Sequence, residues 1–225
     1  MKKAVKIILL MAGLVMLTWL AIGFWGRKKE PVVVAAEVKL PRAADSANYK
    51  MTDSAVHTLR SGYVVLRMGL GADSKLLAGF NRHNKSYSHC GIVMVENGYP
   101  YVYHSIGGED NPDERLRRDS AWFFFSPVYN SAIAVLKYDM DAAAVRRLDS
   151  VVRCWYRRKP LFDMKFDLAT DDKLYCSEFV YKAICAAAED SAYLPISFLG
   201  SKRYVAVDNL FLNSHAAFIS QMKFK

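Results

Sequence analysis

Cysteine and histidine side chains are the residues of this chain best suited to covalent chemistry. The 225-residue sequence contains four cysteines and five histidines, which are Cys90, Cys154, Cys176, Cys185, His57, His83, His89, His104 and His215. No two cysteines form a CxxC pair, which argues against a zinc ribbon or a thioredoxin motif. Four scattered cysteines in a chain of this length do not suggest a disulfide scaffold either. Cys90, Cys154 and Cys185 are therefore interpreted as small buried hydrophobes.

Cys176 differs from the other cysteines by its place in the first turn of a helix predicted over about residues 176–188. The free amides and the dipole at a helix start stabilise an anion, so we expect its thiol to ionise more easily than an ordinary cysteine. Cys185 lies nine residues further along the same helix and lacks this advantage. Cys176 is therefore the candidate nucleophile.

Two histidines flank a predicted hairpin with Asn97-Gly98, the strongest short-range turn signal, at its tip. A tight turn pairs the residues on either side of it, which makes His89 and His104 diagonal neighbours on one face of the sheet. A bulge at Pro100 would break this register. With a tight turn, the two imidazoles lie within reach of each other.

A thiolate nucleophile needs an imidazole beside it and a further group that orients the imidazole. The pattern thus predicts a triad in which Cys176 attacks, His89 acts as base and His104 orients it. Gly91 shares the predicted face of the histidines and leaves open space where a helix start could approach. The spacing alone also permits two other interpretations. The three side chains are structural, or they bind zinc, for which Cys and His are good ligands.

The elements that must position these residues are interleaved helices and strands. Helices are predicted over about 53–59, 75–80, 141–156 and 176–188, and strands over 63–66, 90–96, 99–105 and 132–138. The stretch 106–130 is predicted to be a loop. The order is not a regular βαβ alternation, which indicates an α+β fold with a small, mainly antiparallel sheet packed on helices.

The composition is that of a globular chain with a distinctive N-terminus. Apolar residues make up 52% and charged residues 24%, far too hydrophobic for a disordered chain. The formal net charge is +9, but six basic residues lie in the first thirty positions, opposed only by Glu30. The basic balance is largely a property of that segment, so a nucleic-acid partner loses most of its support.

Residues 7–25 form an uncharged apolar run with basic residues on both sides. At helical rise the run spans about 28 Å, close to the hydrocarbon thickness of a bilayer. It ends in bulky aromatic residues, which favours an uncleaved anchor over a signal peptide. The expected organisation is an anchor over 1–30, a tether over 31–50 and one domain over 51–225. Because a short N-terminal tail usually stays in the cytoplasm, we expect the domain to be periplasmic or otherwise extracytoplasmic.

Several stretches, taken in order, carry a resemblance to a known family. They read SGYVVLR (61–67), SHCGIV (88–93), FDMKFDL (162–168) and YCSEFVYK (175–182). They resemble the permuted papain-like amidases, relatives of the NlpC-type cell-wall hydrolases, in which the histidine precedes the cysteine. The resemblance spans about residues 60–205 and implies a permuted papain-like fold.

By this resemblance Cys176 matches the nucleophile, His89 the base and His104 the orienting position. Many relatives carry Glu at that third position, whereas lecithin:retinol acyltransferase-like enzymes, which share the permuted order, have a second histidine. A further departure is Gly62-Tyr63, where relatives often have Gly-Asp. The second histidine blurs whether the substrate is peptide-like or lipid.

The resemblance implies acyl transfer through an acyl-enzyme that water resolves, with no metal or organic cofactor. The leading hypothesis is a cysteine amidase or peptidase of the cell envelope, acting on peptidoglycan peptides or acyl-amino acids. The alternative enzyme is a lipid acyltransferase or phospholipase, and the alternative without catalysis is an envelope binding module. The expected partners are a peptide-like or acyl-amide substrate and the membrane.

Overall fold

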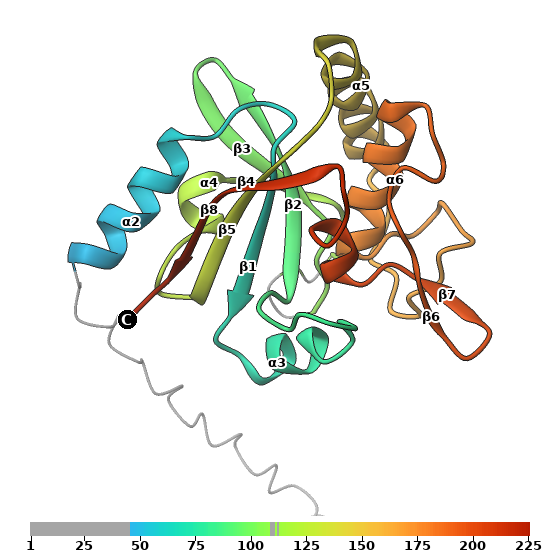
Figure 1. Ribbon diagram of the computed structural model, residues 1–225, viewed down its shortest axis with the longest axis horizontal. Coiled ribbons are helices and arrows are strands. Elements are labelled where there is room, and N and C mark those ends of the chain that lie inside the picture. The colour runs from blue at the N-terminus through green and yellow to red at the C-terminus, as the bar shows by residue number, and fades with distance from the viewer. Residues whose placement is uncertain (1–45, 109–110, 112) are drawn as a thin grey trace, which may run out of the picture. The chain divides into compact units, whose positions relative to one another are not determined.

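The structure, a computed structural model, describes residues 46–108, 111 and 113–225 (Figure 1). The predicted anchor over 1–30 and most of the predicted tether over 31–50 lie outside the described residues, so both stay predictions. Within the described ranges, no helix is long and apolar enough to cross a bilayer.

Helices and strands alternate irregularly along the described chain (Figure 1). In chain order the elements are α2 (Ser46–His57), β1 (Val64–Gly69), α3 (Ala72–Ala78), β2 (His89–Glu96), β3 (Tyr99–His104), β4 (Arg117–Ser120), α4 (Ala121–Phe124), β5 (Asn130–Tyr138), α5 (Ala142–Arg158), α6 (Cys176–Ala188), β6 (Ser197–Leu199), β7 (Lys202–Tyr204), the 3₁₀ helix η1 (Val207–Leu210) and β8 (Ala216–Lys223).

Six strands form one antiparallel sheet in the order β4-β3-β2-β1-β5-β8, and β6 and β7 form a separate hairpin. The turn between β2 and β3 has positive φ at Asn97 and Gly98, 51° and 83°, the conformation that a tight hairpin turn requires. Glu96 pairs with Tyr99, and Pro100 pairs with Val95 without a bulge. The register predicted from the turn is therefore confirmed.

The sheet carries helices on both faces. Successive strand residues point to opposite sides, so the central strands β1, β2, β3 and β5 each contribute to two separate cores. Cys90 and Ile92 of β2 belong to the core shared with α5 and α6, whereas Val93 belongs to the core shared with α2 and α4. The prediction of an α+β fold with an antiparallel sheet packed on helices is confirmed.

Two element predictions were wrong. The first helix begins at Ser46, inside the predicted tether and seven residues before its predicted start at about residue 53. The predicted loop over 106–130 contains β4 and α4. β4 reads Arg-Arg-Asp-Ser and has no hydrophobic alternation to reveal it; its Arg118 donates to Glu96 at 3.1 Å across the sheet edge.

Leu148 of α5 tests the core between the sheet and α6. Leu148 is fully buried, and Leu76 of α3 is 68% exposed. We expect Leu148→Ala to lower the free energy of unfolding by about 2–5 kcal/mol, because it leaves a cavity. The matched change Leu76→Ala should alter it by less than about 0.5 kcal/mol. Urea unfolding followed by circular dichroism measures both, and equal effects would contradict this assignment of the core.

Candidate active site at the start of helix α6

Cys176 is the first residue of α6, as its sequence position predicted. The Glu178 carboxylate accepts a hydrogen bond from the Tyr175 N–H at 3.2 Å, which closes the helix start. Lys182 lies 2.9 Å from the other oxygen of Glu178. Burial raises the pKa of Glu178 to about 7, although the Lys182 ammonium opposes the shift. The carboxylate is thus engaged in capping the helix.

The thiol of Cys176 lies in a nest of hydrogen-bond donors. Its pKa is lowered, first by the neighbouring Cys90 side chain and then by the N–H groups of Ser177 and Cys90. Burial works in the opposite direction. The pKa of Cys90 is raised well above the usual range, because it is fully buried and faces Cys176. Of the two thiols, Cys176 is therefore the one that ionises more easily.

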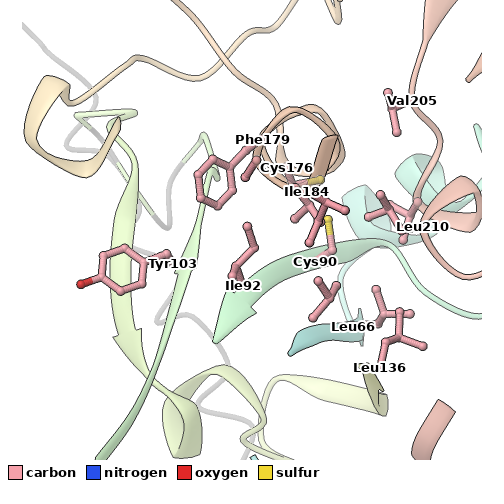
Figure 2. Packing of buried hydrophobic residues seen from close by; sticks show 14 of the residues in the cluster. Leu66, Cys90, Ile92, Tyr103, Leu136, Cys176, Phe179, Ile184, Val205 and Leu210 are labelled. Carbon is pink, nitrogen blue, oxygen red and sulfur yellow. The ribbon is translucent and has the colours of Figure 1, made fainter. Parts of the chain in front are cut away.

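Figure 2 shows the layer in which this pair lies, with the Cys90 side chain pointing from β2 toward α6. Both residues belong to the core between the sheet and α6, together with Phe179 and Ile184. Cys90 is fully buried and Cys176 is 8% exposed. A molecule from solvent therefore meets Cys176 before it meets Cys90.

His89 and His104 are brought together with a third residue that the sequence did not reveal. His89 Nε2 lies 2.9 Å from His104 Nδ1, and His104 Nε2 lies 2.9 Å from an oxygen of Asp119 on β4. Arg117 donates to the other oxygen of Asp119 at 2.9 Å. Because Asp119 can only accept when ionised, His104 carries its proton on Nε2 and accepts on Nδ1. His89 then donates from Nε2, which leaves its Nδ1 free to take up a proton.

Burial and charge set the protonation of this chain of groups. Burial, then the Arg67 guanidinium and His104, hold the pKa of His89 well below its usual value. Burial also lowers the pKa of His104, with Asp119 opposing. Burial alone would raise the pKa of Asp119, but hydrogen bonds from His104 and Arg117 lower it. Both imidazoles are therefore neutral at pH 7, and Asp119 is ionised.

The three predicted triad residues do not form one hydrogen-bonded group. Cys176 contacts Cys90, while the ring of His89 packs on His104 and on Phe124, with centroid distances of 5.0 and 5.7 Å. Among the described residues, no hydrogen bond joins Cys176 to either histidine. His89 and Cys90 are consecutive in β2 and point to opposite faces. The Cys176 thiol does interact with the main-chain N–H of Cys90, and that residue directly follows His89 in the chain.

The expectation that α6 would approach over Gly91 was wrong. A Cβ on Gly91 would lie 2.5 Å from a Val102 methyl and 3.1 Å from His104 Cβ, so the histidine face is already filled there. The helix start packs instead on the face of Cys90. Gly91 serves the close packing of His104 and Val102 rather than access for a helix.

An apolar groove opens beside Cys176. Its walls come from α3, the segment before α6, the β6–β7 hairpin and the segment leading into η1. The side chains that give it this character are Leu77, Phe80, Phe166, Leu199, Val205 and Val207. Phe80 and Phe166 stack at 6.0 Å across it, and the Tyr204 hydroxyl donates to the Phe80 carbonyl at 2.9 Å. A bound apolar chain would lie next to the thiolate.

Comparison with known proteins gives a likeness in fold. No family model matches the chain, and no curated protein matches it. The structure is similar to the crystal structure of metalloprotein yiiX from Escherichia coli O157:H7, described as DUF1105, with a TM-score of 0.60 and 15% sequence identity. The match covers 73% of this chain and 98% of that one. At this identity the likeness shows the fold alone.

The described residues do not fit a metal centre of the kind that the word metalloprotein suggests for that neighbour. They contain no group of three or more His, Cys, Asp or Glu side chains arranged to hold an ion. One ring nitrogen of His104 is hydrogen-bonded to His89, and its second ring nitrogen is hydrogen-bonded to Asp119. The zinc interpretation of Cys176, His89 and His104 gains no support from this geometry.

Cys185 is a matched internal control for the reactivity of Cys176. Both lie on α6, and they are 7% and 8% exposed, but burial raises the pKa of Cys185. We expect iodoacetamide at pH 7 to alkylate Cys176 severalfold faster, because a lowered pKa gives more thiolate at neutral pH. The difference should shrink as the pH rises and both thiols ionise.

Mass spectrometry of the tryptic peptides 174–182 and 183–202 separates the two sites. The variant Cys90→Val removes the side chain that lowers the pKa of Cys176 most and should slow the alkylation of Cys176 at pH 7. Equal rates for Cys176 and Cys185 in the unchanged protein would refute a stabilised thiolate.

Proposed function

We propose that this chain is a cysteine-nucleophile acyl hydrolase of the permuted papain-like class, tethered to a membrane by its N-terminal segment. The observation that carries the proposal is the position of Cys176, whose stabilised thiolate stands at a helix start beside a groove. Attack on an amide or ester carbonyl gives a thioester, which water resolves. The Cys176 N–H, in the first turn where amides lack helical partners, is the natural donor to the oxyanion.

His89 is the proposed base, acting through its free Nδ1. His104 and Asp119 fix the ring by consecutive hydrogen bonds of 2.9 Å, the arrangement that orients a catalytic imidazole. His89 is the first residue of β2, so its ring stands at the end of the strand, beside the amide that contacts the thiol. Catalytic hydrogen bonds are often loose without substrate and tighten on binding. Because the His89 ring packs on His104 and Phe124 on the face opposite the thiol, the proposal requires the ring to move around the end of β2 to reach Cys176 when substrate binds.

The leading substrate class is an amide with an apolar acyl part, such as an acyl-amino acid or a peptide of the cell envelope. A lipid acyltransferase or phospholipase is the second candidate, and the groove is the observation that favours it. The groove walls named above are aliphatic or aromatic side chains, which suit an acyl chain. Both candidates share the thioester chemistry at Cys176 and differ in the leaving group.

Turnover by the full-length protein tests the shared chemistry. Muropeptides, acyl-amino acids and phospholipids form the substrate panel. We expect Cys176→Ala to abolish hydrolysis and His89→Ala to lower kcat by about 10²–10⁴-fold, because proton transfer is lost. Cys185→Ala, on the same helix, is the control and should keep the wild-type rate. Undiminished turnover in Cys176→Ala would sink the proposal.

A series of acyl-amino acids of increasing chain length distinguishes the substrate classes. If the acyl part binds in the groove, each added methylene should raise kcat/KM by up to about fourfold, the equivalent of about 0.8 kcal/mol of burial. Leu199→Asp should flatten this dependence, because Leu199 lines the groove. Phe198→Asp is the matched control, since Phe198 is similarly exposed, 55% against 58%, and is not part of the groove wall. Rates that ignore chain length would argue for a substrate recognised by its polar part.

A further inference from the structure

The pairing of Cys176 with a second thiol is not required for acyl hydrolysis. A helix start, a base and an oxyanion donor suffice for that chemistry. Here the proposed nucleophile has a second, buried thiol as its neighbour in the core, and both cysteines are free. The two residues come from β2 and α6, more than 80 positions apart in the chain, and share one packed core.

We infer that Cys176 and Cys90 form an oxidation site, at which a hydroperoxide converts the two neighbouring thiols into a reversible intramolecular disulfide. The site is independent of the hydrolase proposal, since it needs only the two sulfurs and access to one of them. Its consequence for activity, a reversible loss of the nucleophile, rests on the proposed function.

The two cysteines have unequal access and unequal roles. Cys176 lines the groove and is partly accessible, whereas Cys90 is fully buried beneath it. A small hydroperoxide therefore reaches Cys176 first. The donors around the Cys176 sulfur favour its anionic form, which is the form that reacts with peroxides.

The chemistry balances with the hydroperoxide as the oxidant. The Cys176 thiolate attacks the terminal oxygen, the O–O bond breaks, and the products are a sulfenic acid on Cys176 and an alkoxide that takes up a proton to become an alcohol. Cys90 sulfur then attacks the sulfenic sulfur. The S–S bond forms, the S–O bond breaks, and the thiol proton leaves with the hydroxyl group as water. Two thiols are oxidised, and the hydroperoxide is reduced to an alcohol and water.

Cys90 is the cysteine placed to resolve the sulfenic acid. Its side chain points from β2 toward the helix start that carries Cys176, in the same packed core, so a local approach of the two sulfurs suffices to reach the bond length of about 2 Å. Cys185 lies nine residues along the same helix, which puts it about 13 Å away at helical rise. Cys185 therefore cannot compete within an intact α6.

Peptide mapping of the full-length protein after treatment with hydrogen peroxide tests the inference. We expect a non-reducing tryptic digest to contain peptide 86–115 joined to peptide 174–182, the fragments that hold Cys90 and Cys176. Dithiothreitol should release both peptides and restore iodoacetamide labelling of Cys176. In Cys90→Ser the link cannot form, and Cys176 should proceed irreversibly to sulfinic and sulfonic acids. Cys90→Val is the second variant, because a β-branched apolar residue suits a buried strand position.

Cys185→Ser is the control and should form the disulfide like the unchanged protein. Overoxidised Cys176 together with an alkylatable Cys90 in the unchanged protein would overturn the inference, and so would a link from Cys176 to Cys154 or Cys185. If the disulfide forms but no substrate is hydrolysed, the hydrolase proposal fails while the oxidation site stands. If the protein hydrolyses substrate, keeps that activity after peroxide treatment and forms no disulfide, the oxidation site is refuted while the hydrolase proposal stands.

Discussion

The packing of the start of α6 on β2 is the contact on which the rest of the site depends. It places the Cys176 sulfur against the side chain and amide of Cys90, and these groups, together with the N–H of Ser177, favour the anionic form of a nearly buried thiol. Burial alone would do the opposite, since it disfavours charge. The same packing orders the segment before the helix, whose Ser105–Leu174 hydrogen bond fixes the chain next to the hairpin. This ordered segment before α6 forms one wall of the apolar groove.

The opposite face of the same strand holds a chain of buried polar groups. Two imidazoles and a carboxylate taken out of water are costly unless each is hydrogen-bonded. Here the cost is met by the linear sequence His89–His104–Asp119 and by the guanidinium of Arg117 beside the carboxylate. The edge strand β4 supplies both charged members. A strand without apolar alternation is therefore retained in the sheet by its electrostatic role.

The groove beside Cys176 is assembled from segments far apart in the chain. Phe80 after α3 stacks on Phe166 of the loop before α6, and Tyr204 of β7 ties its hydroxyl to the Phe80 carbonyl. The hairpin β6–β7 adds Leu199 at the rim. None of these segments could form an apolar groove alone, because each is too short to bury its own side chains. Their convergence gives the thiolate an apolar approach, which bears on substrate and oxidant alike.

The sequence by itself determined the local features of this protein. Asn97-Gly98 set the hairpin register and so the contact of His89 with His104, and the periodicity around residues 176–188 placed Cys176 at a helix start. These predictions succeeded because turn geometry and helix periodicity act over a few neighbouring residues. Only the tertiary structure decided which face of β2 receives α6. That choice paired Cys176 with Cys90 and left the histidines on the other face. The tertiary structure also brought Asp119 to His104, because β4, a segment with no strand signal in the sequence, pairs with β3. Adjacent strand residues point to opposite faces, so the face on which a helix packs decides which side chains it meets. Core packing, which involves the whole chain, selects that face.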